Sequence, residues 1–183
     1  MFARKWLLLI LTLAALTLVG ASAAPSPQVT LSNTGMDGLA AVKVQVHIAG
    51  GADWRELVDL DEKRLEKKVQ GLLGGTPGLS VIEGECSIET PRVLVVAVGH
   101  VIADPDGNKD TAATNLSVSL NQPVSVRRQV PSGRPILATG TTWHRNLLIT
   151  GLKNTMRQRV DEKLAYLMQQ FKQEHGRANA GRE

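Results

Sequence analysis

Val-Leu-Val-Val-Ala-Val-Gly-His-Val-Ile, residues 93–102, is an almost continuously apolar run that is bounded by Pro91 on one side and by Asp104-Pro105 on the other. A short apolar run between turn residues is typical of a β-strand. Because it lacks a regular polar alternation, it is typical of a strand that is covered on both faces. We therefore predict a central strand here, with the rest of the domain arranged around it.

Strands with one polar face are predicted before and after this run. Valine and isoleucine alternate with polar residues over 42–48, and apolar and polar residues alternate again over 115–126. A Thr-rich segment follows at 136–143, after the turn residues Pro131-Ser132-Gly133, so residues 116–143 predict a long hairpin. Pro123 and Gly140 within it predict an edge position or a bulge. A short strand is predicted near 79–81.

Two amphipathic helices are predicted. The first begins with a capping box of Asp59 and Glu62 and ends at Gly74-Gly75. Its apolar face is formed by Leu65, Val69, Leu72 and Leu73. The second is longer, and its apolar residues recur every three or four positions: Met156, Val160, Leu164, Leu167 and Phe171.

These elements together predict an α+β fold. Each helix has one apolar stripe, so both must lie on an apolar sheet face. We expect a two-layer sandwich, with a mainly antiparallel sheet of about four or five strands and two helices packed on one face. Residues 39–175 would form this single domain, 24–38 a flexible leader and 176–183 a disordered tail.

The first 23 residues predict a signal peptide. Arg4 and Lys5 precede an apolar run over 6–19, and Ala21-Ser22-Ala23 supplies the small residues at a cleavage site between Ala23 and Ala24. The run is shorter than a membrane-spanning helix requires. We expect an exported protein with no stable membrane span after cleavage, in the periplasm or outside the cell. A retained N-terminal anchor is the alternative.

Composition excludes some classes of function. The formal net charge of +4 falls to +2 without Arg4 and Lys5, so the charge balance offers no footprint for nucleic acid. Cys86 is the only cysteine, which rules out an intramolecular disulfide.

Residues for catalysis or metal binding form no recognisable pattern. The four histidines are dispersed, and no nucleophile motif or phosphate loop occurs. Asp104, Asp106, Asn108 and Asp110 alternate like calcium ligands, but the bidentate glutamate is absent, which favours a hydrophilic turn. We therefore expect a protein that is not an enzyme and binds neither metal nor cofactor.

Binding residues are predicted at the ends of the terminal hairpin. Four arginines gather there with a tryptophan that could anchor an interface: Arg127, Arg128, Arg134, Arg145 and Trp143. Trp54 is a second aromatic candidate. The leading hypothesis is a non-catalytic domain that binds an envelope or secreted protein through its sheet edge or this hairpin. The alternative is a small-ligand-binding or weakly enzymatic domain, with a pocket between sheet and helices near His100.

A resemblance to known proteins covers most of residues 42–171. The run Ser119-Leu120-Asn121-Gln122, the pair Arg127-Arg128, and Thr141-Thr142-Trp143 ahead of a long helix resemble a family of uncharacterised secreted bacterial proteins; Val58-Asp59-Leu60 matches as well. That family has no established activity, so the resemblance implies an α+β fold and an exported location but no catalytic residue. This chain departs from the family's usual aromatic and acidic ending, because Lys172-Gln173-Glu174-His175 follows Phe171.

Overall fold

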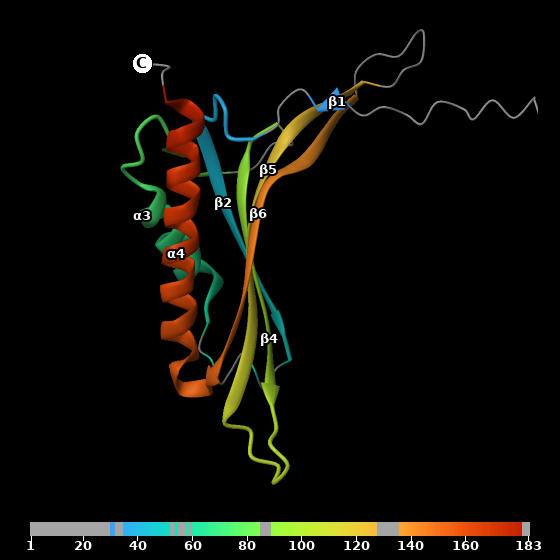
Figure 1. The fold of residues 1–183 in the computed structure, drawn as a ribbon, viewed down its shortest axis with the longest axis vertical. Helices are drawn as coiled ribbons and strands as arrows, with labels where there is room; N and C mark the ends of the chain where they lie inside the picture. The colour runs from blue at the N-terminus through green and yellow to red at the C-terminus, as the bar shows by residue number, and fades with distance from the viewer. Residues whose placement is uncertain are drawn as a thin grey trace, which may run out of the picture.

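The computed structural model describes residues 30–31, 35–51, 54, 58, 60–84, 89–127 and 136–180. The elements in chain order are β1 (Thr30–Leu31), β2 (Ala41–Gly50), α3 (Glu62–Leu73), β3 (Ser80–Val81), β4 (Arg92–Ile102), β5 (Thr111–Arg127), β6 (Ile136–Leu152) and α4 (Lys153–Asn179). Figure 1 shows two layers: a twisted sheet, and both helices on the same side of it. The predicted α+β sandwich is confirmed.

The sheet is mixed, and β4 lies at its centre. The strand order is β6-β5-β4-β2-β3, and β1 pairs with the far end of β5. β4 and β5 are antiparallel, as are β5 and β6, whereas β2 runs parallel to both β3 and β4. The chain crosses from β2 to β4 through α3, as a parallel pair requires. The predicted central position of residues 93–102 is therefore correct.

The long hairpin is the most extensive pairing in the sheet. β5 and β6 pair from Thr111↔Leu152 to Val126↔Ile136, well beyond the predicted 116–143. Pro123 lies past Asn121, the last β5 residue paired with β4, so its missing N–H leaves no gap in that ladder. The register shifts at Leu120/Asn121, which makes Thr142 the extra residue of a bulge. Gly140, where we expected the bulge, pairs with Gln122 instead.

The first residue of α3 differs from the prediction. Asp61, rather than Asp59, caps α3, because the Asp61 carboxylate accepts a hydrogen bond from the Arg64 N–H at 2.7 Å. Glu62 instead accepts the backbone N–H of Ile48. Of the predicted apolar face, Leu65, Val69 and Leu73 are buried, and Leu72 is partly buried against the core.

The ends of the domain are more ordered than predicted. α4 continues to Asn179, so the expectation of a disordered tail from Gly176 is wrong for residues 176–179. Residues 35–38, which we assigned to a flexible leader, are held by hydrogen bonds to α4, and Thr30–Leu31 pairs with β5. Three parts of the chain that the sequence analysis considered lie outside the described residues. They are the predicted signal peptide with its cleavage site between Ala23 and Ala24, the single cysteine Cys86, and residues 181–183.

The core fills the space between the sheet and the two helices. Val44, Val95, Leu116 and Leu120 bury their side chains from three neighbouring strands against the helices. α3 and α4 are joined by the Arg64 guanidinium, which donates to both oxygens of Asp161 at 2.8 and 3.2 Å. Lys172 adds a hydrogen bond to the Leu72 carbonyl near the end of α3. Both helices thereby pack on one and the same face of the sheet.

Candidate interaction face

The other face of the sheet carries neither α3 nor α4, and we call it the open face (Figure 1). Strand alternation and register place the following residues on it: Lys43, Gln45, His47 and Ala49 from β2, Arg92, Leu94, Val96, Val98, His100 and Ile102 from β4, Thr111, Ala113, Asn115, Ser117, Ser119 and Asn121 from β5, and His144, Asn146, Leu148, Thr150 and Leu152 from β6. Our expectation that β4 is covered on both faces is wrong for the described part of the chain.

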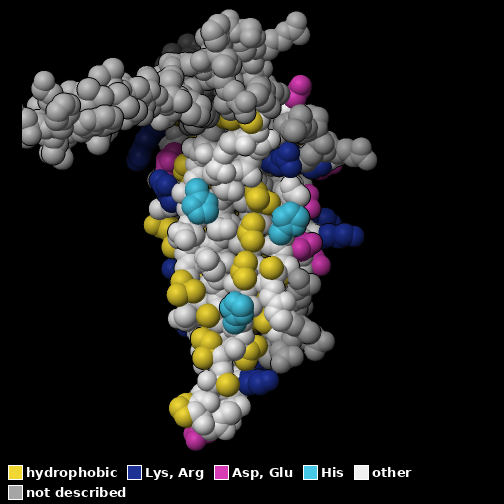
Figure 2. Space-filling model, turned by 90° about the vertical axis from the view of Figure 1, so that its right-hand side faces the viewer, with side chains coloured by type: hydrophobic (Ala, Val, Ile, Leu, Met, Phe, Trp, Pro, Cys, Tyr) yellow, Lys and Arg dark blue, Asp and Glu magenta, His cyan; other side chains and the backbone are white. Residues whose placement is uncertain are grey.

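An apolar strip runs along β4 on this face. Leu94, Val96 and Val98 are only half-buried, although the alternate residues Val93, Val95 and Ala97 are fully buried under the helices. The strip widens at one end, where Ile102, Leu148 and Leu152 are 43%, 73% and 55% exposed. Figure 2 shows this band of hydrophobic side chains running down the face among three histidines.

The charged residues at the described strand positions of this face are cations, whereas the acidic turn 104–110 follows β4 at the Ile102 end. Lys43 and Arg92 are neighbours in the register at one end, and Ser119 separates Leu94 from His144 across the strands. His47 pairs in register with Val96 from the other side. None of the open-face strand positions that the structure describes holds Asp or Glu.

Arg92 has unmet hydrogen-bonding capacity. Its Nε atom is buried and has no hydrogen-bond partner among the described residues. Neither Arg92 nor Lys43 forms an ion pair within that part of the chain. A guanidinium binds carboxylate and phosphate groups especially well, because its planar donors match their geometry. The open face can therefore accept an anionic group at this end.

The predicted binding residues Trp143 and Arg145 lie on the helix side of β6. The Trp143 indole N–H donates to Glu174 of α4 at 2.7 Å, and its ring meets Phe171 edge-on at 5.3 Å between centroids. Arg145 donates to the other Glu174 oxygen at 2.8 Å and lies 5.5 Å from the Trp143 ring. The structure brings these two residues together, in contacts that attach α4 to the sheet.

The other predicted binding residues are not described in enough detail to place. Arg127 ends β5, but its side chain, like Arg128 and Arg134, lies outside the described residues. Their role in binding stays a prediction. Trp54 is 1% exposed, so it is a core residue rather than part of a surface patch.

His100 does not face the helices. The His100 side chain is exposed on the open face, whereas the preceding residue, Gly99, is buried against Trp54 on the helix side. The predicted pocket between sheet and helices therefore does not lie at His100. A depression of about 540 Å³ lies instead along α3 and α4.

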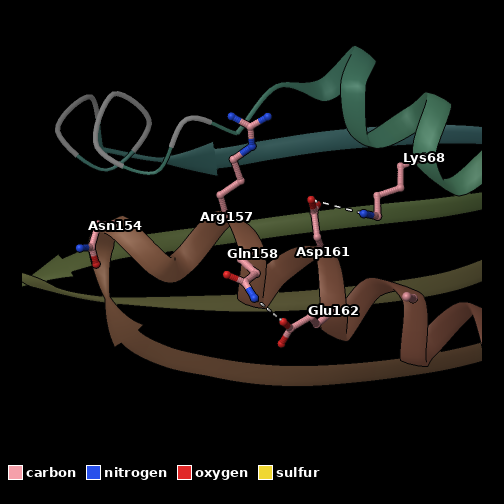
Figure 3. A pocket seen from close by; sticks show the side chains of 7 residues that line it. Lys68, Asn154, Arg157, Gln158, Asp161 and Glu162 are labelled. Atoms are coloured by element: carbon pink, nitrogen blue, oxygen red, sulfur yellow. Dashed lines mark hydrogen bonds and ion pairs between the residues drawn. The ribbon is translucent and has the colours of Figure 1, made fainter.

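The polar groups of this depression are largely satisfied by one another. In Figure 3, Asp161 faces Lys68 and Gln158 faces Glu162. Asp161 also holds Arg64. Such internal pairing gives a ligand few unmet polar partners.

The acidic turn between β4 and β5 is closed by its own hydrogen bonds. Asp104 accepts hydrogen bonds from the side-chain amide and the backbone N–H of Asn108, at 3.1 and 2.7 Å. These hydrogen bonds, the side-chain one first, lower the pKa of Asp104. Within the described ranges, no cluster of three or more acidic, histidine or cysteine side chains could hold a metal ion. No helix among the described residues is both long and apolar enough to cross a membrane.

From the sequence we predicted both helices on one face of the sheet and flanking strands with one polar face, but we missed that the outer face of β4 belongs to the same uncovered surface. Ser117, Ser119 and His47 are polar at alternate positions of the two strands that flank β4. Since neighbouring strands share their faces, these polar positions indicate that the outer face of β4 is not part of the core of this chain.

Comparison with known proteins gives no family. No protein-family model and no curated protein matches the chain. Similar solved structures include rare lipoprotein B from Shewanella oneidensis (11% identity, 72% of this chain and 91% of that chain covered, TM-score 0.33). A PelC dodecamer from Paraburkholderia phytofirmans has 11% identity, coverage of 78% and 95%, and a TM-score of 0.38.

A third similar structure is a putative neuraminyllactose-binding hemagglutinin homolog from Helicobacter pylori, with 11% identity, coverage of 78% and 88%, and a TM-score of 0.37. At identities and TM-scores this low, the three structures establish neither a common family nor a shared function.

Proposed function

We propose that this chain is a non-catalytic exported domain that binds another envelope or secreted component through the open face. The observation that carries the proposal is the apolar strip of Leu94, Val96 and Val98 on the central strand, which α3 and α4 leave uncovered. Contiguous exposed apolar surface rimmed by polar residues marks interaction sites in many proteins. Export is supported by the signal-like pattern of residues 1–23.

The test is site-specific photocrosslinking in living cells of the native host. A photoreactive amino acid at Ser117, in the middle of the open face, is expected to give one discrete adduct at stoichiometric yield. The same group at Gln169, exposed on α4 on the opposite side, is the matched control and should give none. Equal adducts from both positions, or none from Ser117, would overturn the proposal.

The arginine-tipped end of the hairpin is tested in the same cells. If it forms the binding site instead, Arg127→Glu with Arg128→Glu removes the adduct and leaves the melting temperature unchanged. If the open face is the site, Val96→Asp removes the adduct and the arginine pair does not. Mass spectrometry of the purified mature chain in parallel shows whether it begins at Ala24.

A further inference from the structure

We infer that the partner of the open face is an amphipathic α-helix of another protein, with one apolar stripe flanked by acidic side chains. The inference rests on the proposed function and names the partner of the same surface. Two independent features of the face support it: the shape and polarity of the β4 strip, and the sign of the charge around it.

A helix fits the strip because β4 has the composition of a strand that is covered on both faces. Parallel strands, such as the β2–β4 pair, normally have helices on each side of the sheet. From Leu94 to Ile102, with His100 between Val98 and Ile102, the strip spans about 26 Å, at roughly 3.3 Å per residue. A helix of about 18 residues covers that length at 1.5 Å per residue. Such a helix would add a third layer to this two-layer domain.

Acidic flanks fit because the described strand positions of the open face hold two cations and several histidines but no carboxylate. Lys43 and Arg92 stand together at one end, and His47 and His144 flank the strip on its two sides. Arg92 forms no ion pair among the described residues, so the terminal nitrogens of its guanidinium can bind a carboxylate of the partner.

A second copy of this chain is the other occupant to test. A face-to-face pair whose two copies run antiparallel would bring Lys43 and Arg92 of one copy toward the acidic turn between β4 and β5 of the other. If the chain alone sediments as a dimer and Val96→Asp makes it a monomer, the face pairs with itself and the inference of a helical partner is overturned.

The test uses two synthetic helical peptides of about 18 residues, each with leucine at every third or fourth position. One carries glutamate on both flanks and the other carries lysine at the same positions. Binding to the full chain is measured by fluorescence anisotropy at low salt. We expect the acidic peptide to bind at least about tenfold more tightly than the basic one.

Charge-reversal variants identify the surface that binds. Arg92→Glu should weaken binding of the acidic peptide roughly tenfold, and Lys43→Glu should do the same if Arg92→Glu fails to fold. Arg177→Glu changes the net charge equally but lies exposed near the end of α4, so it should leave the affinity unchanged. Equal or tighter binding of the basic peptide, or no loss with either face variant, would overturn the inference.

Three further outcomes separate this inference from the proposed function. If vesicles containing anionic lipid retain the chain and the peptides do not, the partner is a membrane surface rather than a helix. If neither peptide binds although Ser117 gives its adduct in cells, the inference of a helical partner fails, and the proposal that the open face is an interaction site is kept. If neither peptide binds and Ser117 gives no adduct, both proposals fail.

Discussion

Trp54 lies against two glycines of adjacent strands. Gly50 and Gly99 are partners in the parallel β2–β4 register, and a Cβ atom on either would meet the indole ring. The glycines thus leave a space in the sheet that the largest side chain of the core fills, with 1% of its surface exposed. A residue that we first considered for a surface patch is a packing element.

Gly99→Ala should therefore destabilise the fold. The added methyl group would overlap the Trp54 ring, and overpacking of this kind costs about 3 kcal/mol. Gly71→Ala is the control, because Gly71 lies in α3 with nothing near its Cβ position, and alanine there should stabilise by about 1 kcal/mol. Urea unfolding followed by circular dichroism measures both. A neutral Gly99→Ala variant would show that the indole moves aside at little cost.

At the scale of elements, β4 has two faces that look alike in sequence and differ in the structure. Val95 is fully buried under the helices, whereas Val96, the next residue, is half-buried on the open face. The difference arises from the sheet alternation and from the position of α3 and α4 on one side only. Stability and binding should therefore depend on different valines of one strand.

Val95→Ala should cost about 2 kcal/mol of unfolding free energy, because it removes buried methyl groups and leaves a cavity. Val96→Ala should cost less than about 1 kcal/mol. The order reverses for binding: Val96→Ala should lower the affinity for the acidic peptide, and Val95→Ala should leave it unchanged. Chemical denaturation and peptide anisotropy on the same two variants test this. If Val95→Ala and Val96→Ala lower the free energy of unfolding equally, Val96 is as well buried as Val95, and the open face is not open.

At the scale of the whole molecule, the last turns of α4 hold the segment that precedes β2. The His175 Nε2–H donates to the Leu39 carbonyl at 2.8 Å, and the Asn179 side chain donates to the Met36 carbonyl at 3.0 Å. Asn179 also accepts the Gly38 N–H at 2.8 Å. The two ends of the domain are tied together by residues more than 130 positions apart, which is why 176–179 stay helical.

Asn179→Ala should lower the free energy of unfolding by about 1 kcal/mol, since it removes partly exposed hydrogen bonds to Met36 and Gly38. Amide hydrogen exchange should increase at Gly38. Gln173→Ala, an exposed position on the same helix, is the control and should change neither quantity. If the amide of Gly38 exchanges at the same rate in the Asn179→Ala variant, the Asn179 side chain does not hold the segment before β2.

Local pattern determined the elements of this protein. The alternation of residues 42–48 and 115–126, the apolar run 93–102 and the helical periodicity of 156–171 each depend on neighbouring residues, so they can be recognised without the fold. The two-layer architecture followed because each helix has one apolar stripe to bury. The candidate hairpin residues, in contrast, came from clustering in sequence, and two of them, Trp143 and Arg145, contact Glu174, which lies far along the chain.

Only the tertiary structure decided which apolar surface is covered. The Val-Leu-Val-Val-Ala-Val run is apolar on both faces, and nothing within it distinguishes Val95 from Val96. α3 lies in the crossover from β2 to β4, and α4 follows β6. Both helices pack on the same side of the sheet. Burial is a property of contacts between residues distant in sequence, and these contacts left Leu94, Val96 and Val98 available to a partner.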